Sequence, residues 1–177
     1  DPSEYMAQKW AFSLSDKCIV LEDDDVPAVS FFGFCKELLD KYEHDTRISM
    51  IAGFNNEEIT PDITSDYFFA TTFSIWGWAS WKRVIDQWDE HYTFLEDTFN
   101  MQQLEQLIKE RKFRKDFIYM CHRHKENNKA YYETIFHASM LFNSGLAIVP
   151  TRNMINNLGV TADSTHFAGS VHTLPKG

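Results

Sequence analysis

The sequence predicts an α/β fold in which short buried strands alternate with amphipathic helices. Three short runs, at 18–21, 48–53 and 146–150, are apolar and rich in β-branched residues, which is typical of buried strands. The segments between them carry apolar residues at the helical period. The chain has 177 residues, of which 44% are hydrophobic, so it is long and apolar enough for a full core. We therefore expect a single domain over residues 1–177.

Helical periodicity is clearest over 31–42, and Pro27 and Ser30 mark the start of that helix. Because this helix connects the runs at 18–21 and 48–53, the two strands should form a βαβ unit and pair in parallel. The remaining segments are assigned from their period, aromatic content and turn residues. Further helices are expected over 5–14, 78–88, 98–111, 113–124 and 131–142, a further strand over 66–73, and loops over 55–65 and 153–169.

Charge and cysteine content narrow the functional classes. The net charge is −9, which disfavours nucleic acid and anionic lipid as partners. No apolar run is long enough to span a bilayer, and no signal peptide is visible. The three cysteines form no CxxC pair, and Cys18 and Cys35 lie inside apolar patterns. We therefore expect reduced core cysteines in a cytoplasmic protein without a transmembrane segment.

The run at 18–21 ends in four consecutive acids, Glu22, Asp23, Asp24 and Asp25. Adjacent carboxylates repel one another, so they are costly at the end of a strand unless a cation joins them. In open α/β sheets, ligands bind at the carboxyl ends of the strands. Oxygen ligands suit Mg²⁺ or Mn²⁺, and these ions commonly bridge to a substrate diphosphate. The alternative is an acidic turn that caps the next helix.

Three tryptophans, Trp76, Trp78 and Trp81, lie within six residues around Gly77. Flat aromatic rings stack on flat apolar faces, so Trp76 and Trp78 are candidates for a platform that binds a sugar or a base. Gly77 would let the backbone pass close to such a ligand. The alternative is that these tryptophans are buried in the core.

The sequence 22–24, followed by a Phe-rich helix, resembles the metal motif of GT-A glycosyltransferases, and its Glu-Asp-Asp form is similar to that of N-acetylglucosaminyltransferase I and its bacterial relatives. Other segments resemble motifs of the bacterial relatives, in the same order and with similar spacing across most of the chain. They are Trp76-Gly77-Trp78-Ala79-Ser80-Trp81, Tyr132-Glu133-Thr134, Ala147-Ile148-Val149-Pro150, Asn153-Met154-Ile155-Asn156-Asn157-Leu158-Gly159 and Ser164-Thr165-His166. Each motif is short, and their shared order makes the resemblance more specific.

The resemblance implies a GT-A fold, which is a mixed sheet flanked by helices. The first β-α-β segment of the family has no counterpart before Tyr5, so the chain resembles the later part of such a domain. The implied activity is the metal-dependent transfer of a sugar from a nucleoside-diphosphate sugar to a hydroxyl of a glycan or other acceptor, with inversion. Mn²⁺ or Mg²⁺ would act as a Lewis acid that neutralises the leaving diphosphate.

The resemblance also implies roles for individual residues. Asp24 would coordinate the metal directly, and Glu22 and Asp23 would contact the ribose or the metal's water ligands. His166 would add a second contact to the metal or to a phosphate. Asp25 extends the acidic run beyond the family's motif, so it is a further candidate metal ligand.

Glu133 stands where the family has the aspartate of a Trp-Asp pair, which makes it the candidate base for the acceptor hydroxyl. Its aromatic neighbours Tyr131, Tyr132 and Phe136 predict burial and a raised pKa, which suit that task. The alternative is an exposed acid in the first turn of a helix, where the helix dipole favours negative charge.

Two other functional classes stay open. One is a metal-dependent phosphohydrolase or nucleotidyltransferase, which would need more carboxylates around a second metal. The other is a non-catalytic domain that binds glycans or nucleotide sugars through its tryptophans.

Overall fold

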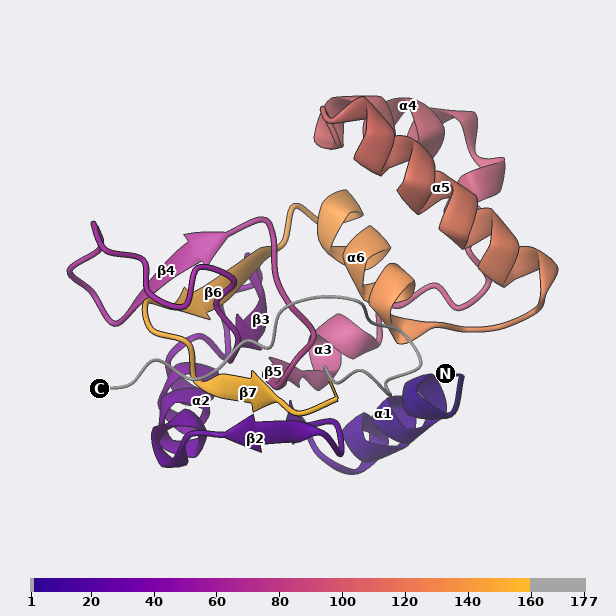
Figure 1. The fold of residues 1–177 in the computed structure, drawn as a ribbon. Coiled ribbons are helices and arrows are strands. Elements are labelled where there is room, and N and C mark those ends of the chain that lie inside the picture. Colours follow the sequence, from indigo (N-terminus) through magenta and orange to yellow (C-terminus); the bar gives the residue numbers. More distant parts are fainter. Residues whose placement is uncertain (1, 160–177) are drawn as a thin grey trace. The chain divides into compact units, whose positions relative to one another are not determined.

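The computed structural model describes residues 2–159, and its contacts divide the chain into two compact units. The helical unit consists of the chain up to Asp16 together with Lys82–Gly145. The sheet unit consists of Lys17–Trp81 together with the chain from Leu146 onward. The expected α/β class is confirmed, because a mixed sheet and several helices make up the fold (Figure 1). The single domain that we expected is thus organised as two units.

The helical unit begins with α1. Its other helices belong to Lys82–Gly145, the stretch of sequence that separates the two segments of the sheet unit. Asp97 and Glu110 start two of its helices, because their side chains accept hydrogen bonds from backbone N–H groups of the first turn. Within residues 2–159, no helix combines the length and apolar character needed to cross a membrane. The helices are α1 (Pro2–Leu14), α3 (Lys82–Ile85), the 3-10 helix η1 (Thr93–Glu96), α4 (Thr98–Leu107), α5 (Arg111–Glu126) and α6 (Tyr132–Phe142).

Aromatic side chains form the centre of the helical unit. The ring of Trp88 stacks on Tyr5 of α1 and on Tyr132 of α6, with centroid distances of 6.0 and 6.4 Å. Phe136, one turn further along α6, lies 5.2 Å from the same ring. The start of α6 is therefore held in an aromatic environment from which water is largely excluded.

The sheet unit contains five strands in the order β1-β5-β3-β6-β4 and a separate two-stranded ribbon of β2 and β7 (Figure 1). β3 and β6 pair in parallel, and every other pair is antiparallel. The elements are β1 (Lys17–Val20), β2 (Asp25–Pro27), α2 (Val29–Lys41), β3 (Ile48–Ala52), β4 (Tyr67–Ala70), β5 (Trp78–Trp81), β6 (Leu146–Pro150) and β7 (Ile155–Asn157).

The expected parallel pair of β1 and β3 does not form. The two strands run in the same direction, but β5 lies between them and pairs with both in antiparallel fashion. The prediction of a helix over 78–88 was also wrong, because Trp78–Trp81 forms β5 and only Lys82–Ile85 is helical. All four residues of β5 are buried. A run that is apolar on both faces gives no helical or strand period, so its pairing with two neighbours decides its structure.

Two of the three cysteines are fully buried. Burial raises the pKa of the Cys35 and Cys121 thiols to about 12 in each case. Cys18 in β1 is half-buried, and none of the three, all of which lie in the described chain, forms a disulfide. The prediction of a reduced core cysteine is confirmed for Cys35.

Ile155 of β7 packs directly against two glycines of the sheet unit. A Cβ atom added to Gly77 would lie 2.4 Å from Ile155 Cδ1, and one added to Gly53 would lie 2.6 Å from Ile155 Cγ1. Gly77 also has a φ of +58°, which L side chains rarely adopt. The sequence suggested that Gly77 allows close approach of a ligand, but in the structure its close neighbour is Ile155.

We expect Gly77→Ala to lower the free energy of unfolding by at least about 2 kcal/mol, because positive φ and overpacking each cost about 1–3 kcal/mol. Urea denaturation measures this change. Gly33→Ala is the matched control, since Gly33 lies in α2 with nothing within 4 Å of an added Cβ. That variant should gain about 0.5–1 kcal/mol. An unchanged unfolding midpoint for Gly77→Ala would contradict the close packing on Ile155.

Candidate functional site

The acidic run forms a loop between β1 and β2 that the ribbon holds from one side. β1 ends at Val20, and Asp25 is the first residue of β2, where it pairs with Asn157 of β7. The backbone N–H of Leu158 donates to the carbonyl of Asp24 at 2.8 Å. The backbone N–H of Asp25 donates to the carbonyl of Glu22 at 3.1 Å, which closes the turn. The loop therefore has a defined conformation without a ligand.

Asp25 uses its carboxylate to hold this loop. Its Oδ2 accepts from the backbone N–H of Glu22 at 3.1 Å, and its Oδ1 accepts from Nδ2 of Asn157 at 3.3 Å. Burial raises the pKa of Asp25, while these hydrogen bonds and one from the backbone of Gly77 oppose the rise. This geometry gives Asp25 a positioning role in the loop.

Asp24 lies against the chain that follows β7. Its Oδ1 accepts from Nδ2 of Asn157 at 3.0 Å. A Cβ atom on Gly159 would lie 1.8 Å from Oδ2 of Asp24, so a larger residue at this position would displace the carboxylate. The N–H of Gly159 donates to Oδ1 of Asn157 at 2.9 Å, which fixes the approach.

Asp23 is exposed, and Glu22 and Asp24 are partly exposed. Across residues 2–159, no three His, Cys, Asp or Glu side chains lie together as a complete metal-binding group. Mg²⁺ usually binds through one or two carboxylates and takes its other ligands from water and substrate phosphates. Asp23 and Asp24 can supply the one or two carboxylates that such an ion needs. His166 lies outside the described residues, so its contact with metal or phosphate remains a prediction.

The two candidate tryptophans lie in different environments. Trp78 is 0% exposed in the centre of the sheet, so the structure favours the core alternative for it. Trp76 is partly exposed, and its ring meets Phe54 edge to face at a centroid distance of 4.7 Å. Of this pair, Trp76 is the residue with ring surface available for a ligand.

Glu133, in the helical unit, is the second residue of α6. Its Oε2 is buried and has no hydrogen-bond partner among the residues that the structure describes. Burial raises the pKa of Glu133, its own backbone N–H opposes the rise, and the negative charge of Glu4 adds to it. The burial and the direction of the pKa agree with the predicted base and differ from an exposed acid at a helix start.

Sequence reasoning missed the asparagines that organise the loops of the sheet unit. Oδ1 of Asn153 accepts from the backbone N–H groups of Asn55 and Ile155, at 3.1 and 3.3 Å. Asn157 bonds both Asp24 and Asp25. The segment 153–159 was expected to be a loop, because β7 has three residues and is too short to show a strand period. The three asparagines of this segment, Asn153, Asn156 and Asn157, were the sequence feature that could have indicated an ordered, hydrogen-bonded segment.

Comparison of the sequence with protein-family models and with curated proteins finds no match. The resemblance of its motifs to GT-A enzymes therefore stays a prediction.

Proposed function

We propose that this chain belongs to a metal-dependent glycosyltransferase of the GT-A type. The substrate would be a nucleoside-diphosphate sugar, and the acceptor would be a hydroxyl group of a glycan. The observation that carries the proposal is that the acids of the loop differ in their hydrogen bonds and in their exposure to solvent. Both oxygens of Asp25 accept hydrogen bonds that hold the loop. At the carboxyl end of β1, Asp23 is exposed, and the partly exposed Asp24 accepts a bond from Asn157 through one oxygen.

The residues of the loop have distinct tasks under this proposal. Asp24 would hold Mn²⁺ or Mg²⁺, and Glu22 and Asp23 would contact the ribose or the metal's water ligands. The bound cation would neutralise the charge that develops on the diphosphate. Asn157 positions Asp24, and Gly159 keeps the backbone close to it.

Glu133 would accept the proton of the acceptor hydroxyl. The acceptor oxygen would bond to the anomeric carbon of the sugar as the bond from that carbon to the diphosphate breaks. A buried carboxylate with a raised pKa is a better base for this step than an exposed one, because its pKa lies closer to neutral pH. Attack from the face opposite the diphosphate gives inversion at that carbon.

Calorimetric titration with a panel of nucleoside-diphosphate sugars, with Mn²⁺ and then with EDTA, tests the proposal. We expect at least one member to bind with Mn²⁺ and to lose at least about tenfold in affinity in EDTA, because the cation bridges the acidic loop and the diphosphate. The corresponding nucleoside monophosphate should bind more weakly. Metal-independent binding of the whole panel would favour a non-catalytic binding domain, and release of inorganic phosphate would favour a phosphohydrolase.

A further inference from the structure

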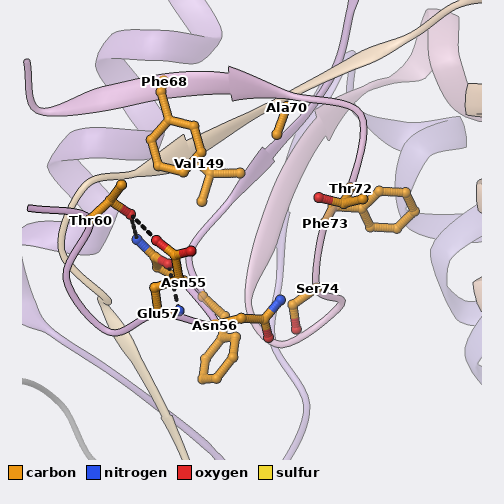
Figure 2. A pocket seen from close by; sticks show the side chains of 11 residues that line it. Asn55, Asn56, Glu57, Thr60, Phe68, Ala70, Thr72, Phe73, Ser74 and Val149 are labelled. Carbon is orange, nitrogen blue, oxygen red and sulfur yellow. Dashed lines mark hydrogen bonds between the residues drawn. The ribbon is translucent and has the colours of Figure 1, made fainter. Parts of the chain in front are cut away.

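The sheet unit contains a cavity of about 300 Å³ that none of the roles above uses. Phe68 and Ala70 of β4 and Val149 of β6 line one side of it. Residues of the segments 54–60 and 72–74 line the other sides (Figure 2). Side chains alternate along a strand, so Phe68 and Ala70 face away from Tyr67 and Phe69, whose rings contact the rings of α2 and its end. The cavity therefore opens on the face of β4 opposite to α2.

Hydrogen bonds around Asn55 fix the shape of the cavity. Nδ2 of Asn55 donates to Oγ1 of Thr60 at 3.0 Å and to the carbonyl of Pro150 at 2.9 Å. Its Oδ1 accepts from the backbone N–H of Glu57 at 2.9 Å. Oγ1 of Thr60 in turn donates to Oε2 of Glu57 at 3.2 Å, as the dashed lines in Figure 2 indicate. The segment is tied to the end of β6, so the cavity is formed before a ligand enters.

The lining combines neutral polar groups with aromatic rings. Amides and hydroxyls come from both flanking segments, and Phe68 contributes a ring from the sheet. Among the eleven described residues that line the cavity there is no Lys, Arg or His, and Glu57 supplies the one formal charge. A phosphate or sulfate group would meet this carboxylate without a compensating cation. The polar lining residues are Asn55, Asn56, Glu57, Thr60, Thr72 and Ser74.

The geometry points to a neutral saccharide as the ligand of this cavity. Sugar hydroxyls pair with amide, hydroxyl and carboxylate groups, and the apolar face of a sugar ring packs on an aromatic ring. A volume of about 300 Å³ lies at the lower end of the range for small-molecule sites, which suits one sugar ring better than an intact nucleotide sugar.

Along the strand direction, the cavity lies toward the ends of β3 and β6 that are level with the end of β1, but the acidic loop follows β1 and the cavity lies on β4, the two outermost strands of the sheet. Trp78, the first residue of β5, pairs with the last residue of β1 and with the last residue of β3. Phe54, which lines the cavity, follows β3 and contacts the partly exposed Trp76. A neutral sugar here would therefore be a unit of the acceptor that lies several strand widths from the acidic loop, an assignment that rests on the proposed transferase function. Binding of the saccharide itself needs neither the acidic loop nor a metal.

Saturation-transfer NMR with a panel of neutral mono- and disaccharides, in EDTA, tests this site. We expect wild-type protein to bind at least one of them. Ala70→Leu should weaken this binding strongly, because the added carbons occupy part of the cavity, while Thr71→Leu on the exposed neighbour should not. Mn²⁺-dependent nucleotide binding should be the same in both variants, which separates failure of this site from failure of the proposed function.

Glu57→Gln provides a second test that leaves the cavity volume unchanged. It replaces a charge-assisted hydrogen bond by a neutral one, so saccharide affinity should fall about fivefold. Glu58→Gln is the matched control, because Glu58 is exposed in the same segment and does not line the cavity. Circular dichroism confirms folding of each variant. No saccharide binding by the wild type, unchanged binding by both Ala70→Leu and Glu57→Gln, or preferential binding of inorganic phosphate would overturn the inference.

Discussion

Glu133→Gln should reduce the transfer rate by about 10²–10⁴-fold and, at the same time, make the protein more stable at neutral pH. The rate falls because the amide keeps the shape of the side chain but cannot accept the proton. Donor and metal binding should be retained, since Glu133 is not among the residues of the acidic loop. Steady-state kinetics at saturating donor and acceptor measure the first effect, and thermal unfolding measures the second.

The gain in stability follows from the raised pKa of Glu133. Burial lifts this pKa above the ordinary value of 4.5, so the folded state binds its proton more tightly than the unfolded chain does. Stability is therefore lost as the pH rises from about 4.5 through the folded pKa, and the glutamine variant lacks this loss. The variant should match the wild type at low pH and exceed it at pH 7. A gain of about 2–4 °C in Tm corresponds to about 1 kcal/mol in a chain of this size.

Glu105→Gln is the control for this experiment, because Glu105 lies exposed on α4 of the same unit. It should change neither the rate nor Tm. Glu4→Gln removes the negative charge that adds to the pKa of Glu133, so it should move the acidic limb of the pH–rate profile to lower pH. Unchanged turnover of Glu133→Gln would remove this residue from the catalytic step. A variant less stable than wild type at pH 7 would show that the carboxylate has a partner.

We expect Asp24→Ala to lose metal-dependent nucleotide binding and Asp25→Ala to lose stability. Asp24→Ala should weaken Mn²⁺-dependent binding of a nucleoside diphosphate by at least about 100-fold, because loss of a direct ligand exceeds the 10–100-fold cost of losing a supporting residue. Its stability should change little, since Nδ2 of Asn157 keeps its bond to Asp25. Asp25→Ala removes the carboxylate that accepts from the part-buried backbone N–H of Glu22, so the free energy of unfolding should fall by about 1–3 kcal/mol.

Calorimetry with Mn²⁺ and urea denaturation separate the two results. Asp62→Ala, in an exposed position of the segment between β3 and β4, is the control for a general loss of negative charge. If Asp25→Ala abolishes binding while Asp24→Ala binds as the wild type does, Asp25 is the metal ligand and the assignment above is wrong.

The sequence by itself determined the elements that have a clear period or a clear boundary. β3 and β6 were predicted from short apolar runs, and α2, α5 and α6 from apolar residues at helical spacing. It also predicted the position of the acidic loop after β1 and the raised pKa of Glu133 through burial. These features depend on neighbours in the chain, so local sequence contains the information that specifies them.

Only the tertiary structure decided the position of β5 between β1 and β3, and the pairing of β2 with β7. It also decided how the acids of the loop are held, because Asp24 and Asp25 both meet Asn157, which lies 133 and 132 positions away from them in the sequence. Trp78 and Trp76 look alike in the sequence, yet Trp78 is fully buried at the start of β5 and Trp76 keeps exposed surface. Pairing between distant segments fixes these features. The hydrophobic pattern of one segment does not reveal its partner, because the contacts that stabilise the pairing exist only after the chain has folded.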